Sequence, residues 1–155
     1  MIPGLPASIA GARARILLEG VRAWAADRPD VAAVALVGSW ARGTARPDSD
    51  IDLVIVTHDV AGFFAFPGWL AHFGKPTDRI EETYGVLRAL RVWYADGPEV
   101  EFGVVPPSWC ATDPVDSGTA GVVLDGLVAL YDPVGVLARL VGAVNLPPPT
   151  PFPGR

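Results

Sequence analysis

The stretch GSWARGTARPDSDIDLVIV, residues Gly38–Val56, decides the fold of this chain of 155 residues. The apolar run Val31–Val37 leads into it, and its last four residues, Leu53–Val56, form a second apolar run. Short, nearly continuous apolar runs bounded by turn residues are typical of strands that are buried on both faces of a sheet. We therefore expect two buried strands joined by a polar connection, with the first strand in the middle of a sheet.

Two aspartates, Asp50 and Asp52, stand two positions apart where the second strand begins. Because side chains alternate along a strand, both carboxylates point to one face, while Ile51 between them points to the core. Two like charges held this close repel each other, and a divalent cation relieves the repulsion. Magnesium is usually held by one or two carboxylates together with phosphate oxygens and water. The pair therefore predicts a magnesium site that also receives a phosphate.

The Gly38-Ser39 step supplies a second part of the same site. If a short helix starts there, the free backbone amides at its N-terminus bind phosphate, which glycine allows to approach closely and the serine hydroxyl can hydrogen-bond. If the two strands pair antiparallel, these amides and the carboxylates meet at one sheet edge. Two roles stay open for Arg42: a contact to phosphate, or a brace for the loop against Asp48 or Asp50.

The other elements follow from hydrophobic periodicity and turn residues. Asp96-Gly97 between two strand-like runs is a strong hairpin signal. Ser8 is the expected cap of the first helix. The patterns predict helices at Ser8–Asp27, Trp69–Phe73 and Val134–Val144, strands at Glu82–Leu87, Ala89–Tyr94 and Glu99–Val105, a short strand or strand pair at Val122–Tyr131, and loops at Gly74–Asp78 and Pro106–Gly118.

Composition narrows the classes of partner. The net charge is -5, Lys75 is the single lysine, and the arginines are scattered, so we expect no nucleic-acid partner. Cys110 is the single cysteine, which suits a reducing cytoplasm, and no apolar run is long enough to suggest a membrane span. We expect one domain over residues 1–146, followed by a proline-rich, disordered tail over residues 147–155.

The order Gly38-Ser39, ten residues, then Asp50-Ile51-Asp52 and an apolar strand closely resembles the nucleotidyltransferase superfamily of DNA polymerase beta. It looks most like the minimal nucleotidyltransferases and the aminoglycoside nucleotidyltransferases of bacteria. The resemblance covers residues 31–56 and includes Ala41-Arg42-Gly43 and Ser49. It implies an α/β (α+β) fold of the polymerase beta type, with a mixed central sheet and flanking helices.

The resemblance also implies an activity. Such enzymes transfer a nucleoside monophosphate from a magnesium-bound triphosphate, here expected to be ATP, to an acceptor hydroxyl and release pyrophosphate. Two Mg²⁺ ions about 3.5 to 4 Å apart activate the attacking and leaving oxygens. The nucleotide-binding residues implied for this chain are Gly38, Ser39, Arg42 and Ser49.

The reaction normally uses a third carboxylate on a neighbouring strand. The residue that we predict for this position is Glu101 in Val100-Glu101-Phe102. It stands between apolar neighbours, where burying a lone carboxylate is costly without a cation. Glu99 shares its face and is the rival, although it lies closer to the hairpin turn. The predicted catalytic and metal-binding residues are therefore Asp50, Asp52 and Glu101.

Three functions are compatible with these observations. In the first, an active nucleotidyltransferase modifies a small cationic acceptor, such as an aminoglycoside, which acidic residues such as Asp96 and Glu99 attract. In the second, an antitoxin-type minimal nucleotidyltransferase adenylylates a toxin-like partner protein. The short chain favours this second function, because the acceptor site must come from loops, a homodimer mate or the partner. The third is a catalytically silent nucleotide-binding module.

Overall fold

The computed structural model of the chain describes residues 11–85 and 87–145. They form a six-stranded mixed sheet with the strand order β3-β4-β5-β2-β1-β6. β2 and β5 pair parallel, and the other neighbouring strands pair antiparallel. The strands are β1 (Val31–Val37), β2 (Ile51–Thr57), β3 (Pro76–Tyr84), β4 (Leu87–Tyr94), β5 (Glu99–Val105) and β6 (Leu127–Tyr131).

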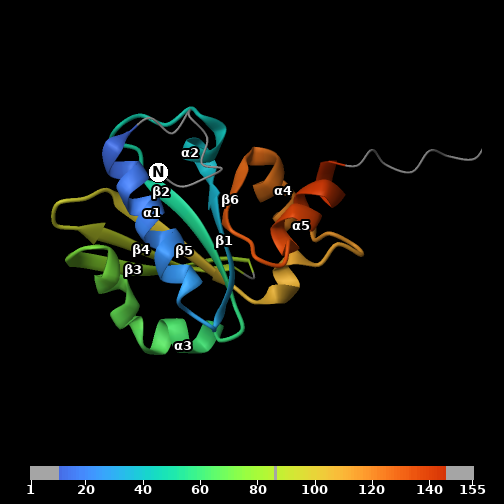
Figure 1. Ribbon diagram of the computed structural model, residues 1–155, viewed down its shortest axis with the longest axis horizontal. Coiled ribbons are helices and arrows are strands. Elements are labelled where there is room, and N and C mark those ends of the chain that lie inside the picture. Colours follow the sequence, from blue (N-terminus) through green and yellow to red (C-terminus); the bar gives the residue numbers. More distant parts are fainter. Residues whose placement is uncertain (1–10, 86, 146–155) are drawn as a thin grey trace, which may run out of the picture.

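Helices cover both faces of this sheet. The helices are α1 (Ala12–Ala26), α2 (Gly38–Arg42), α3 (Val60–Ala65), α4 (Ser117–Asp125) and α5 (Val136–Asn145), with 3-10 turns η1 (Pro67–Phe73) and η2 (Pro107–Cys110). Figure 1 shows α1 and α3 to one side of β1, and α4 and α5 to the other. The expected α+β class with a mixed central sheet is confirmed.

Each face of the sheet carries its own apolar core. Because β2 side chains alternate, Leu53 and Ile55 pack into the core that includes α1, whereas Val54 and Val56 pack with α4 and α5. β1 lies between β2 and β6 and is therefore an interior strand. The prediction of strands buried on both faces is correct here, and the bounds of β1 and β5 agree with the predicted ones.

The segment from Val60 begins with a helix that the sequence prediction omitted. Asp59 caps this helix, α3, by accepting a hydrogen bond from the Gly62 N–H at 3.0 Å. A Cβ atom on Gly62 would lie 2.1 Å from Oδ2 of Asp59, so glycine is what lets the capping carboxylate fold back. The glycine that suggested a break in the helix is therefore part of the cap.

Two further predictions are wrong in their element boundaries. β3 begins at Pro76, inside the expected loop, and ends at Tyr84, and Gly85 with φ +62 takes the turn that the prediction had placed within a strand. The region expected to be a strand or strand pair is helix α4, capped by Asp116 on Thr119 N–H, and then β6. Ser8 and the tail with its domain boundary lie outside the described residues.

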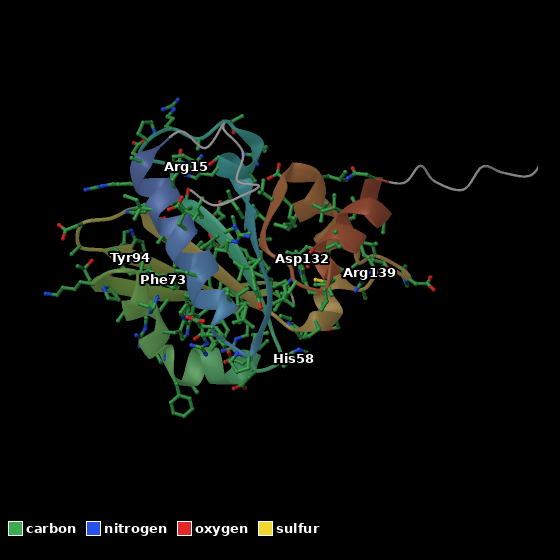
Figure 2. The ribbon with its side chains drawn as sticks, viewed as in Figure 1. Arg15, His58, Phe73, Tyr94, Asp132 and Arg139 are labelled. Carbon is green, nitrogen blue, oxygen red and sulfur yellow. The ribbon has the colours of Figure 1, made fainter. Side chains whose placement is uncertain are left out.

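The last helix is confirmed with slightly shifted ends. Asp132 precedes α5, and its carboxylate accepts hydrogen bonds from the N–H groups of Leu137 at 3.1 Å and Ala138 at 2.9 Å. Figure 2 shows Asp132 near this helix and Arg139 on it. The capped helix packs against β1 and β6, and its Leu137 and Leu140 are fully buried.

Candidate active site

The end of β1 and the start of β2 bring the two parts of the central motif together. The antiparallel register places Val37, the last residue of β1, opposite Asp52. Gly38 follows with φ +73, a conformation that favours glycine, and begins the short helix α2. A Cβ atom on Gly38 would lie 2.4 Å from Oδ2 of Asp52. The glycine backbone and the carboxylate are therefore in direct contact, as the antiparallel pairing predicted.

Three carboxylates from two neighbouring strands converge beside this turn. The parallel pairing of β2 with β5 sets Asp52 level with Glu101, and Asp50 stands directly before β2. Within the described part of the chain, Asp50, Asp52 and Glu101 each offer an oxygen, and these oxygens all lie within 4.8 Å of one another. All three residues are half-buried. Clustered carboxylate oxygens are the ligands that magnesium and calcium prefer.

The electrostatics of the cluster favour a positive charge. Burial, followed by the charges of Asp50 and Glu101, raises the pKa of Asp52 to about 7. The pKa of Glu101 is also raised, first by burial, while the nearby Arg91 opposes this shift. The protonated, neutral forms of these carboxyl groups are favoured because several negative charges lie close together in a partly desolvated environment. A divalent cation between these oxygens would remove that cost.

The structure distinguishes the two glutamates that competed for the third position. Glu101 belongs to the carboxylate cluster, whereas Glu99 stands two residues nearer the hairpin turn, opposite Trp93. Glu99 forms an ion pair with Arg91. The arrangement therefore brings Glu101, and not Glu99, next to Asp50 and Asp52.

Arg42 forms an ion pair with a residue that the sequence did not suggest, Asp125 at the end of α4. Its Nη1 donates to Oδ2 of Asp125 at 2.6 Å and to the backbone carbonyl of Asp125 at 3.3 Å. Of the two roles left open for Arg42, the brace against Asp48 or Asp50 is therefore not formed, and Arg42 contacts the end of α4 instead. Gly126 makes room for it, since a Cβ atom there would lie 2.8 Å from Cγ of Arg42.

The two serines of the motif shape the connection between β1 and β2. The Ser49 hydroxyl accepts a hydrogen bond from Arg46 N–H at 2.8 Å, and its carbonyl accepts one from the Trp40 indole at 3.2 Å. The Ser39 carbonyl accepts from Thr44 N–H at 3.0 Å. Trp40 is buried, so its role is in the core.

A cavity of about 300 Å³ opens beside the carboxylates. It reaches from Gly38, Asp52 and Glu101 to Val122 and Asp125 on α4. Its remaining lining is mostly apolar and comes from the five strands β1 to β5. The cavity therefore joins an acidic end to an apolar floor.

Arg91 is a site residue that the sequence analysis missed. It lies on β4 opposite Glu101, and its guanidinium donates to Glu101 Oε2 at 2.9 Å and to Asp50 Oδ2 at 3.4 Å. The sequence feature that could have identified Arg91 is a charged residue inside the otherwise apolar predicted strand Ala89–Tyr94. Its face depends on the hairpin register, which the sequence did not supply.

His58 and Cys110 stand apart from this chemistry. Figure 2 shows His58 beyond the end of β2 that is opposite α2. Cys110 is buried, and burial raises the pKa of its thiol to about 11, which makes it unreactive at neutral pH. Neither residue takes part in the site.

Comparison with known proteins agrees with this geometry. A family model described as a nucleotidyltransferase domain matches residues 18–96, just over half of the chain, and this range contains most of α1, the Gly38-Ser39 turn and both aspartates. The chain belongs to this nucleotidyltransferase family, and the resemblance noted in the sequence is confirmed.

A solved structure resembles this chain in part. An aminoglycoside 6-adenyltransferase from Bacillus subtilis is similar with 15% sequence identity and a TM-score of 0.46, over 58% of this chain and 34% of that one. The chain thus spans about a third of that protein. No match is found among curated proteins. None of the helices in the described ranges is long and apolar enough to cross a bilayer.

Proposed function

We propose that the chain transfers a nucleoside monophosphate from ATP to an acceptor hydroxyl, with magnesium held by Asp50, Asp52 and Glu101. The observation that carries the proposal is the convergence of these three carboxylates, within 4.8 Å of one another, beside the Gly38 backbone. The carboxylates supply oxygen ligands for a cation. The glycine turn lets a phosphate approach the backbone closely.

The residues fit a divalent cation on two grounds. The donor set is all oxygen, and burial together with the charges of Asp50 and Glu101 raises the pKa of Asp52 to about 7, a cost that a bound cation would relieve. The sequence resemblance implies two ions, and Asp50 and Asp52 are the candidates to share them. When bound, the cation supplies charge neutralisation for the phosphates and polarises the reacting phosphorus.

The residues of the chain have distinct roles in this proposal. Gly38 leaves the backbone open to the phosphates, Ser39 and Arg42 supply hydrogen-bond donors, and Ser49 holds the connecting loop. The acceptor oxygen forms a bond to the α-phosphorus, the bond from that phosphorus to its bridging oxygen breaks, and pyrophosphate leaves. Glu101 takes the proton of the acceptor hydroxyl, a role that its raised pKa favours.

Two acceptor classes remain in competition. A small cationic acceptor is supported by the acidic groups around the cavity, including Asp125 and Glu101. A partner protein is supported by two large side chains on the edge strand β3: Ile80 is 50% exposed, and Tyr84, which also lines the cavity, is 49% exposed. Exposed apolar groups next to a reactive site are suited to a protein surface.

The experiment that tests the function is nucleotide transfer followed by mass spectrometry. The purified chain is incubated with ATP and magnesium, together with aminoglycosides in one arm and co-purifying proteins in another. An added nucleoside monophosphate identifies the acceptor class. Asp52→Asn should abolish the product. Tight ATP binding without product on any acceptor would contradict transfer and favour a silent binding module.

A thermal-shift measurement tests the cation site without an acceptor. Magnesium-ATP should raise the unfolding midpoint of the wild type through preferential binding to the folded state. Asp50→Asn and Asp52→Asn should remove the magnesium-dependent part of that rise. Retention of the full rise in both variants would show that these carboxylates do not hold the metal.

A further inference from the structure

Arg91 is anchored at its outer end by side chains that the proposed reaction does not use. Its Nε donates to Glu82 Oε1 at 2.6 Å, and the Tyr84 hydroxyl donates to the other Glu82 oxygen at 2.5 Å. Glu99 forms a further ion pair with Nη1. These contacts come from β3 and from the beginning of β5, and they hold the guanidinium through Nε and Nη1.

At its inner end Arg91 reaches two of the three clustered carboxylates. Nη1 lies 3.4 Å from Oδ2 of Asp50, and Nη2 lies 2.9 Å from Oε2 of Glu101. Each contact uses one oxygen, so a second oxygen on each carboxylate is not engaged by Arg91. The guanidinium is planar and its donors have fixed directions, so it sets the orientation of the groups that it binds.

The geometry points to Arg91 as a positioning residue that orients Asp50 and Glu101 so that they can hold the divalent cation together with Asp52. This inference rests on the proposed function of the site. Arg91 acts through the two carboxylates and does not itself contact the reacting groups. Its side chain is 23% exposed, which limits the alternative orientations open to it.

Two effects of Arg91 on a cation oppose each other. Its positive charge repels the incoming ion, whereas its fixed donors hold the ligands in place. Replacement of groups that orient metal ligands typically lowers metal affinity about 10- to 100-fold. Lysine separates the two effects, because it keeps the charge but lacks the planar set of donors. If orientation dominates, lysine at this position weakens cation binding although the charge is unchanged.

The test measures Mn²⁺ binding to the full chain by electron paramagnetic resonance, in the absence of nucleotide and at pH 8. We expect Arg91→Lys to bind Mn²⁺ at least about tenfold more weakly than the wild type. The matched control is Arg88→Lys. Arg88 is on the same strand but faces the other side of the sheet, where it contacts Glu81 and the Phe64 ring. This control should bind Mn²⁺ like the wild type.

A second pair of variants addresses the outer anchor without touching Arg91. Glu82→Gln loosens the Nε contact, whereas Glu81→Gln removes an equal charge from the neighbouring residue, which is bound to Arg88. We expect Glu82→Gln to weaken Mn²⁺ binding more than Glu81→Gln does, with unfolding midpoints close to that of the wild type. Both glutamates are on an edge strand, so these variants should fold.

The outcomes separate this inference from the proposed function. A wild-type chain that binds no Mn²⁺ overturns the proposed cation site, and the positioning role with it. Wild-type binding together with unchanged affinity in Arg91→Lys overturns the positioning role alone. Equal effects of Glu82→Gln and Glu81→Gln would also contradict it, because charge without orientation would then explain the result.

Discussion

Gly38 and Asp52 are in contact because β1 and β2 pair antiparallel: a Cβ atom on Gly38 would lie 2.4 Å from the Asp52 carboxylate oxygen. The contact ties the position of the turn to the position of a proposed metal ligand. A side chain at residue 38 therefore disturbs the backbone and the carboxylate at the same time.

Gly38→Ala is expected to lower both stability and magnesium-ATP binding. Gly38 has φ +73, and a left-handed conformation costs a non-glycine residue about 1 to 2 kcal/mol, to which the contact with Asp52 adds. Chemical denaturation should show a loss of at least about that size, and the thermal shift with magnesium-ATP should decrease.

The control for this variant is Gly121→Ala. Gly121 lies in α4, and a Cβ atom added there would meet nothing within 4 Å, so alanine should be neutral or stabilise by up to about 1 kcal/mol. If Gly38→Ala behaves like this control, the close contact with Asp52 is not important for the site.

Asp52→Asn should stabilise the metal-free chain in a pH-dependent way. The folded-state pKa of about 7 lies above the ordinary value of 3.8, so the folded chain holds a proton that the unfolded chain releases between these pH values. Stability of the wild type therefore falls as the pH rises from about 4 to 7, and asparagine removes this loss. The advantage of the variant should grow over that range and stay constant above it.

Urea denaturation in the presence of a chelator, at several pH values, measures this difference. Asp50→Asn provides a comparison, because it removes one of the charges that raise the Asp52 pKa. A constant difference between wild type and Asp52→Asn from pH 4 to 8 would show that Asp52 titrates at its ordinary value.

The part of the site that is formed by residues close together in the sequence was predictable, because its patterns involve only neighbouring positions. β1, the Gly38 turn and the alternation of Asp50 and Asp52 all follow from residues close together in the sequence. Glu101 was also predictable, since a carboxylate between apolar neighbours in β5 requires a compensating partner. The bounds of β1 and β5 follow from the same apolar patterns.

Arg91 was not predictable because its place depends on a register. A two-residue turn at Asp96-Gly97 would set Arg91 opposite Phe102, whereas the observed pairing sets it opposite Glu101. A shift of one residue changes which side chains share a face. The first part of β3, before Glu82, was missed for a different reason: it is a polar edge strand with mostly exposed residues, so it lacks the apolar alternation that identifies a strand.

Arg42→Ala is expected to weaken ATP binding much more than it lowers stability. The Arg42–Asp125 ion pair is exposed, and such pairs contribute about 0 to 1 kcal/mol. A charged hydrogen bond to phosphate contributes about 1.5 to 3 kcal/mol, which corresponds to at least about a tenfold loss of affinity. Asp125→Asn frees Arg42 and should leave ATP affinity equal or higher. Calorimetric titration of both variants distinguishes a phosphate contact from a brace for α4: equal losses in both would indicate the brace.

Val122→Trp tests whether the cavity beside the carboxylates receives the nucleotide. Val122 lines this space of about 300 Å³ from α4, and the larger side chain would fill much of it without removing any of the proposed metal ligands. We expect ATP affinity to fall at least about tenfold, as a steric block of a binding pocket requires, while Mn²⁺ binding stays at the wild-type level. Leu124→Trp is the control, because Leu124 is on the same helix but is 69% exposed and does not line the cavity. If both tryptophan variants bind ATP equally well, the nucleotide does not occupy the cavity, which is then left for the acceptor.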